Sequence, residues 1–199
     1  MKKILLLTAV AAASLLPMAA NADVVLLVNL SVANQVTISA TSGVSAATVS
    51  GSTTTGFYLQ NFFFTTVAGT VTGAGVGNIS TFLNPADNSP TGFRAGTGSI
   101  DPGFNIWSYS TASTTGFTSG TQAFSGSATF TLSTSAYNQA LAALGSVLNR
   151  NVYFPADDVN DLTTATAIGT WQVVPEPSTA AFCVLGLGGL AVTALRRRK

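Results

Sequence analysis

The densest group of side chains that could do chemistry lies in the last quarter of the chain. Asp157, Asp158, Asn160 and Asp161 follow Pro155 within a short stretch. Calcium prefers oxygen ligands such as carboxylates and amide carbonyls, so this cluster could hold a calcium ion. The alternating order and central glycine of an EF-hand loop are absent, however, and Asp and Asn also cap backbone N–H groups in ordinary turns. The sequence therefore leaves two interpretations, a calcium site and a solvated acidic turn, and it predicts no other cofactor.

Most enzyme mechanisms need residues that this chain lacks. The sequence has no histidine, which is the commonest general base and the commonest zinc ligand. Its one cysteine, Cys183, lies in an apolar stretch near the C-terminus, and residues 23–174 contain no lysine. Thiol nucleophiles and Schiff bases are therefore excluded from those residues. Carboxylates remain, and two of them about 5 to 10 Å apart could serve a glycoside hydrolase. We predict that the protein is not an enzyme, with a carboxylate-based glycan hydrolase as an alternative.

Two repeated patterns resemble binding motifs. Gly73, Gly75 and Gly77 are similar to a phosphate loop, but the third glycine comes one residue early and no helix pattern follows, so we expect a flexible turn. Thr-x-Thr triplets, which could form an array of hydroxyls on a sheet face, occur at 70–72, 129–131 and 164–166. They begin 59 and 35 residues apart. No solenoid repeat can align them at those spacings.

The charges of the chain are divided between its ends and its centre. Residues 23–174 carry six aspartates and two arginines, a net charge of −4, although the whole chain is formally +1. The other basic residues all lie in the two ends. Phosphate contacts from Lys and Arg dominate nucleic-acid binding, so nucleic acid is excluded as a partner of the central part.

The N-terminal residues have the pattern of a secretory signal peptide. Two lysines precede an uncharged, mostly apolar run, Ile4–Leu16, and Ala20 and Ala22 supply the small residues before a cleavage site. We therefore predict that residues 1–22 form a signal helix that is removed. The alternative is a retained N-terminal anchor, but the 13 residues of the run are few for a membrane span.

The C-terminal residues predict a membrane span with its end in the cytoplasm. Residues 178–195 carry no charge, and 18 helical residues reach about 27 Å, enough to cross a bilayer. A basic cluster follows directly and should stay on the cytoplasmic side. The cluster consists of Arg196, Arg197, Arg198 and Lys199. A plain C-terminal anchor is one interpretation of this pattern.

A short proline motif precedes the predicted span and favours a second interpretation. Pro175, Glu176 and Pro177 should hold the chain extended, because each proline fixes its own φ and disfavours helix in its predecessor. Together with the span and the basic end, residues 174–199 resemble the PEP-CTERM sorting tail of Gram-negative bacteria. The resemblance implies recognition by an exosortase, a membrane-embedded cysteine transpeptidase that cuts near the motif and releases or transfers the rest of the protein.

The remaining residues, 23–173, predict one exported all-β domain. They are rich in Ser, Thr, Gly and Val, and short apolar runs alternate with turn signals. Disorder is the alternative for such a composition, but the spacing of the runs is typical of an antiparallel β-sandwich, jelly-roll-like in form. The expected strands are 24–30, 32–40, 57–67, 79–83, 104–110, 127–133 and 169–174.

One stretch of this domain has the period of an amphipathic helix. Between Ser135 and Asn149, four large side chains recur at a spacing of four, three and four residues, and Ser135 could cap the first turn. These side chains are Tyr137, Leu141, Leu144 and Leu148. We expect the helix to cover one end or edge of the sandwich.

These features together predict an exported protein that the inner membrane holds until its tail is processed. We expect it at the cell surface or outside the cell, as a structural or adhesive component associated with exopolysaccharide. The alternative is a calcium-assisted carbohydrate-binding module that uses Trp107, Tyr109 or Tyr153 as a sugar platform. The glycan hydrolase is the third hypothesis.

Overall fold

A computed structural model describes residues 22–65, 72–90, 101–109, 112–145 and 149–174. The expected signal helix, the proline motif, the expected span and the basic cluster lie outside these residues, apart from Ala22. Among the described residues, no helix combines the length and apolar character that crossing a membrane requires.

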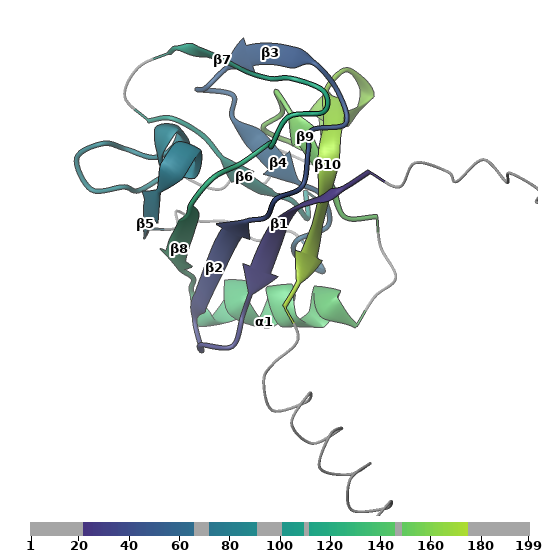
Figure 1. Ribbon diagram of the computed structural model, residues 1–199. Helices are drawn as coiled ribbons and strands as arrows, with labels where there is room; N and C mark the ends of the chain where they lie inside the picture. The colour runs from purple at the N-terminus through teal and green to yellow at the C-terminus, as the bar shows by residue number, and fades with distance from the viewer. Residues whose placement is uncertain (1–21, 66–71, 91–100, 110–111, 146–148, 175–199) are drawn as a thin grey trace, which may run out of the picture.

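In the described part of the chain, ten strands form one large sheet and one small sheet. The large sheet has eight strands in the order β5-β8-β2-β1-β10-β9-β4-β6, and the small one pairs β3 with β7. The strands are β1 Val24–Asn29, β2 Gln35–Ala40, β3 Val49–Ser52, β4 Phe57–Leu59, β5 Thr72–Val76, β6 Phe104–Ile106, β7 Thr114–Phe117, β8 Ser127–Thr131, β9 Asn151–Phe154 and β10 Thr166–Val173. Figure 1 shows that the large sheet is curled and that a helix, α1 (Thr134–Leu144), lies across one end. The predicted all-β class is confirmed.

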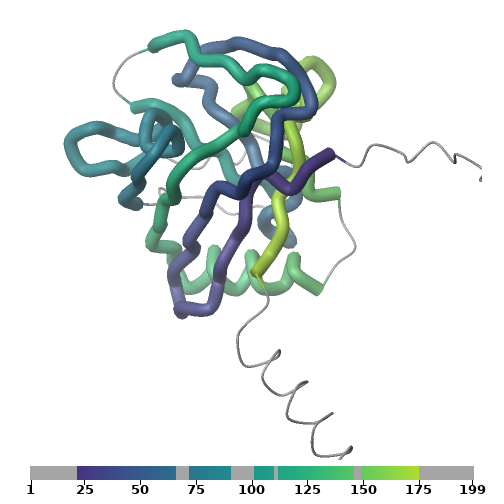
Figure 2. The backbone as a smooth tube through the Cα atoms, viewed as in Figure 1, coloured from purple at the N-terminus to yellow at the C-terminus, as the bar shows by residue number. Residues whose placement is uncertain are grey.

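The centre of the large sheet joins the first and last strands of the domain. β1 and β10 pair in parallel, with Val28 opposite Val173, while the other pairs are antiparallel. The two strands lie side by side in Figure 2 although they are far apart in sequence. The prediction of a purely antiparallel arrangement is therefore wrong at this pair. No hairpin joins the two strands, so connectivity does not fix their relative direction.

Aromatic rings fill the interior of the curled sheet. Phe57 packs against Phe82 and Phe124 with ring centroids 5.0 and 4.8 Å apart. Phe104 packs against Phe130 at 5.2 Å, in an edge-on geometry that aromatic pairs favour. All five rings are at most 2% exposed. Because burying one such side chain is worth roughly 1.5–3 kcal/mol, this core holds the sheet together without a disulfide.

Three segments differ from the strands that the sequence predicts, and one of them, at 104–110, simply ends early, at Ile106. The expected strand at 79–83 is instead a 3-10 helix, η1 (Gly77–Phe82), because Ile79 and Phe82 both point into the core and lie three residues apart. The expected long strand at 57–67 ends at Leu59. Asn61 follows with a φ of 56°, in the left-handed region, and turns the chain out of the sheet.

The predicted flexible turn at the glycine cluster is also wrong, because most of it is strand β5. A Cβ atom at Gly73 would lie 2.5 Å from Cδ1 of Phe130, and one at Gly75 would lie 2.9 Å from Cδ1 of Leu83. These two glycines therefore allow core side chains to approach the strand backbone closely.

The predicted helix is confirmed, but it presents a different face to the core. Its buried residues are Ala136, Ala140 and Ala143, whereas Leu141 is 37% exposed. The small alanines allow the helix to approach the end of the sheet more closely than a row of leucines would. Tyr137 and Leu144 pack at the margin of the core.

The helix begins two residues earlier than expected, with its N-cap at Ser133 and not at Ser135. The Ser133 hydroxyl accepts a hydrogen bond from the Ala136 N–H at 3.1 Å, as an N-cap side chain does. The Tyr137 hydroxyl donates to the Leu30 carbonyl at 2.6 Å and ties the helix to the end of β1.

Candidate functional site

The acidic cluster lies in the connection between β9 and β10, where a 3-10 helix, η2 (Val159–Thr163), begins. Side-chain oxygens of Asp157, Asp158 and Asp161 lie within 4.8 Å of one another, and all three residues are half-buried. The structure therefore brings together the three carboxylates that the sequence proposes as calcium ligands.

Hydrogen bonds within the cluster organise the turn. One oxygen of Asp158 accepts from the Asn160 N–H at 2.6 Å and from the Asp161 N–H at 3.3 Å. Asp158 is thus the N-cap of η2. The Asp161 carboxylate accepts from the Asp157 N–H at 2.9 Å. These are the backbone capping bonds that the acidic-turn interpretation predicts. Calcium binding stays a prediction.

A buried aspartate and tyrosine lie directly beneath this turn. Asp101 is fully buried and Tyr58 is 1% exposed. The Tyr58 hydroxyl donates to one oxygen of the Asp101 carboxylate, which also accepts from the Gly103 N–H at 2.9 Å. The other carboxylate oxygen accepts from the Val159 N–H of η2 at 3.3 Å. The pair therefore anchors the acidic turn to the interior.

The environment of this pair shifts both titrations. Burial raises the pKa of Asp101, and the hydrogen bonds from Tyr58, Gly103 and Val159 oppose that rise by stabilising the carboxylate. Burial, together with the neighbouring Asp101, raises the pKa of Tyr58 far above its usual value. No local pattern in the sequence indicates this pair, since 43 residues separate its members.

The aromatic residues predicted as a sugar platform do not share one strand. Tyr109 is 56% exposed, and Trp107 and Tyr153 are half-buried. Trp107 and Tyr109 follow β6, whereas Tyr153 lies on β9, with β4 between the two strands. The Tyr153 hydroxyl accepts a hydrogen bond from the Asn151 side chain at 3.2 Å.

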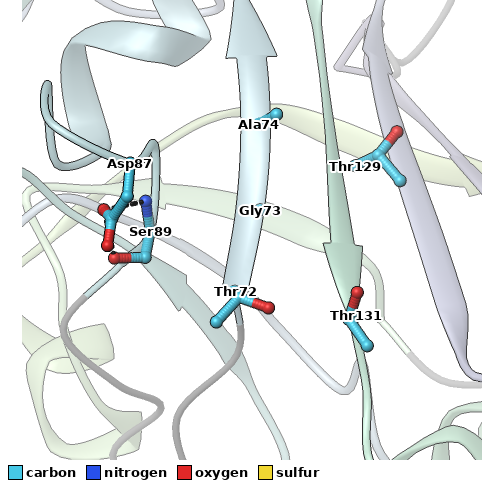
Figure 3. Close-up of a pocket in the computed structure, with 7 residues that line it drawn as sticks. All are labelled: Thr72, Gly73, Ala74, Asp87, Ser89, Thr129 and Thr131. Carbon is cyan, nitrogen blue, oxygen red and sulfur yellow. Dashed lines mark hydrogen bonds between the residues drawn. The ribbon is translucent and has the colours of Figure 1, made fainter.

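A pocket of about 350 Å³ lies on the outer face of the sheet, at β5 and β8. Figure 3 shows Thr72, Thr129 and Thr131 on these strands, with Asp87 and Ser89 on the loop beside them. The Asp87 carboxylate accepts hydrogen bonds from the Ser89 hydroxyl at 2.6 Å and the Ser89 N–H at 3.0 Å. These bonds lower the pKa of Asp87.

This pocket contains parts of two of the threonine triplets. Thr72 lies opposite Thr131 in the pairing of β5 with β8. On the other side of β8, the Thr129 hydroxyl hydrogen-bonds the Thr37 hydroxyl of β2 at 2.9 Å. The sheet thus places the last threonine of one triplet opposite the last threonine of another without a solenoid repeat, through antiparallel pairing of distant segments. The spacing of the triplets along the chain excludes a solenoid repeat, but it does not exclude pairing of distant strands, which is what forms this pocket.

The chain leaves the domain directly from the middle of the large sheet. β10 ends at Val173, and the Val174 N–H still donates to the Val28 carbonyl of β1 at 2.9 Å. The proline motif begins at the next residue, so no linker separates it from the folded domain.

The fold and this exit define an all-β domain with a C-terminal extension. A comparison with known families identifies this extension, because the model of the PEP-CTERM protein-sorting motif matches residues 173–199. The chain therefore carries a PEP-CTERM sorting tail, as its residues predicted. The motif implies export, processing at the membrane and an exosortase as the processing partner. No curated protein and no solved structure matches the chain.

Proposed function

We propose that the protein is a structural or adhesive component of the cell surface or extracellular matrix, associated with exopolysaccharide. A signal peptide at 1–22 starts its export. The span at 178–195 then holds it in the inner membrane until an exosortase cuts near the proline motif. The exported domain is a jelly-roll-like sandwich that acts by binding and assembly and performs no catalysis.

The observation that carries the sorting step of this proposal is the junction between the domain and the tail. The sorting motif match begins at residue 173, within a strand at the centre of the eight-stranded sheet. A cut after Val174 would leave β10 whole, whereas a cut before it would remove paired residues from the sheet. The junction therefore suits release of an intact folded domain.

The surface chemistry of the domain supports a role in assembly. The outer face of β5, β8 and β2 presents threonine hydroxyls from Thr72, Thr131 and Thr37. Neutral hydroxyls of this kind can exchange hydrogen bonds with the hydroxyls of a polysaccharide, and they carry no fixed charge that would have to be neutralised.

Mass spectrometry of the protein from its native host tests the sorting step. We expect a mature C-terminus between Val174 and Ser178 and a mature N-terminus at Asp23. A Glu176→Ala variant should keep its C-terminal end and remain in the membrane fraction. An intact Lys199 on surface-localised wild-type protein would contradict processing and leave a plain anchor.

A second candidate function is carbohydrate binding, favoured by the hydroxyl-lined pocket and by the three clustered carboxylates. Purified protein should then retain matrix polysaccharide in a pull-down experiment. Loss of retention on calcium removal and in Asp158→Asn would support the calcium-assisted form, because asparagine keeps the cap but loses the charge. Calcium-independent retention that is lost in Thr131→Val would place binding in the pocket. Turnover of the glycan would instead support the hydrolase.

A further inference from the structure

Three exposed apolar side chains lie at the end of the domain where the chain leaves for its tail. Val32, in the turn between β1 and β2, is 55% exposed, and Phe64 is 56% exposed. The Phe64 N–H donates to the Gln139 carbonyl of α1 at 3.1 Å, so Phe64 lies beside the helix. Leu141, on α1 itself, is 37% exposed. Figure 1 shows that β10 and the β1–β2 turn reach this same end. We call these three side chains the exit patch.

The charges of the described residues are distributed unevenly with respect to this end of the domain. Arg150 is their one basic side chain, and it donates to the Leu144 carbonyl at the end of α1 at 3.3 Å. Asp23 and the acidic cluster lie at the starts of β1 and β10, at the opposite end of those strands. Asp101 is buried. Asp87 lies beside β5 and shares a pocket with Thr131, near the start of α1. Three strands, β8, β2 and β1, lie between β5 and β10 in the sheet. The nearest exposed described acid is thus separated from β10 by three strands, while Arg150 directly precedes β9, the strand next to β10.

The length of the connection to the expected span fixes how close this end lies to the membrane. Val174 is hydrogen-bonded to β1, and the span is expected to begin at Ser178, four residues later. Four extended residues reach at most about 14 Å. The headgroup layer on one side of a bilayer takes up roughly 5–8 Å of that reach. The exit end is therefore held within about 10 Å of the headgroups.

We propose that the exit patch rests on the outer surface of the inner membrane while the tail is uncut. Val32, Phe64 and Leu141 enter the interface between headgroups and acyl chains. The Arg150 guanidinium lies over the Trp171 ring, 5.0 Å from its centroid, and adds a positive charge near this end without needing to leave the protein surface. This seating fixes the proline motif at the depth where a membrane-embedded enzyme can reach it. The inference rests on the proposed function, because it requires a tail that spans the bilayer.

The test uses the full chain in vesicles of three parts phosphatidylethanolamine to one part phosphatidylglycerol. In a Cys183→Ala background, Leu141→Cys and Val44→Cys each carry an environment-sensitive NBD label. Val44 is a matched control because it is 36% exposed and lies at the opposite end, where its N–H donates to Asp23 at 3.0 Å. We expect a blue-shifted label at 141 that shallow spin-labelled lipids quench several-fold more strongly than the label at 44.

Two readouts separate this inference from the proposed function. Flotation with the vesicles and protection of Lys199 from external protease report insertion of the tail. If the tail is inserted but the labels at 141 and 44 behave alike, the exit patch does not touch lipid and the inference is overturned, while the anchored tail stands. If the chain does not float, the spanning tail itself is overturned, and the inference fails with it.

Discussion

Replacing Tyr58 by phenylalanine should destabilise the domain by an amount that depends on pH. The variant removes one hydroxyl from a fully buried site and leaves the Asp101 carboxylate with the Gly103 and Val159 N–H donors. A hydrogen bond to a charged group contributes about 1.5–3 kcal/mol. We therefore expect the free energy of unfolding to fall by about 2 kcal/mol at pH 7.

The direction of the pH dependence follows from the pKa of Asp101. The raised folded-state pKa means that Asp101 binds its proton more tightly in the folded protein than in the unfolded chain. Proton binding therefore stabilises the fold fully below the unfolded pKa of about 3.9. This stabilisation is lost as pH rises through the folded-state pKa. The Tyr58 hydroxyl lowers the folded pKa, so its removal raises that pKa further. The loss caused by the variant should consequently be smallest near pH 4 and grow toward neutral pH.

Tyr137→Phe is the matched control. Its hydroxyl donates to the uncharged Leu30 carbonyl at 2.6 Å. Its loss should cost about 1 kcal/mol at every pH. Urea unfolding of both variants and the wild type, from pH 4 to pH 7.5 and in mild detergent for the full chain, measures the difference. If the cost of Tyr58→Phe were as independent of pH as that of the control, Asp101 would not titrate as this reasoning requires.

Three further substitutions, two of them paired with a control substitution, test other local contacts. Gly103→Ala should cost about 3 kcal/mol or more in thermal unfolding, because its Cβ would lie 1.7 Å from the neighbouring tyrosine ring. Gly145→Ala, whose nearest neighbour would be 3.9 Å away, should be nearly neutral. Ser133→Ala should lower stability by about 1 kcal/mol through loss of the helix cap, while Ser135→Ala should change it by less than about 0.5 kcal/mol; equal effects would contradict the assigned cap. Asp158→Ala should cost about 1 kcal/mol without calcium, and a further calcium-dependent rise in melting temperature confined to the wild type would support metal binding.

Features that depend on neighbouring residues could be predicted from the sequence. The sorting tail follows from a proline motif, an uncharged run and a basic end that are contiguous in the chain, and the family comparison confirms it. The strand containing Val36 and Ile38 follows from alternation, since successive side chains point to opposite faces. The amphipathic helix follows from its period, and the acidic turn from residue types that cap backbone N–H groups over two or three residues.

Features that depend on which distant segments meet were decided by the tertiary structure alone. The parallel pairing of β1 with β10, the alignment of Thr72 with Thr131 and the contact of Tyr58 with Asp101 each join residues separated by 40 or more positions. The space available at the end of the sheet also decided that α1 buries its alanines and leaves Leu141 exposed. Local patterns determined the sorting tail and several of the elements, because those depend on adjacent side chains. The packing of the curled sheet set its sites, because only packing brings remote side chains within hydrogen-bonding distance.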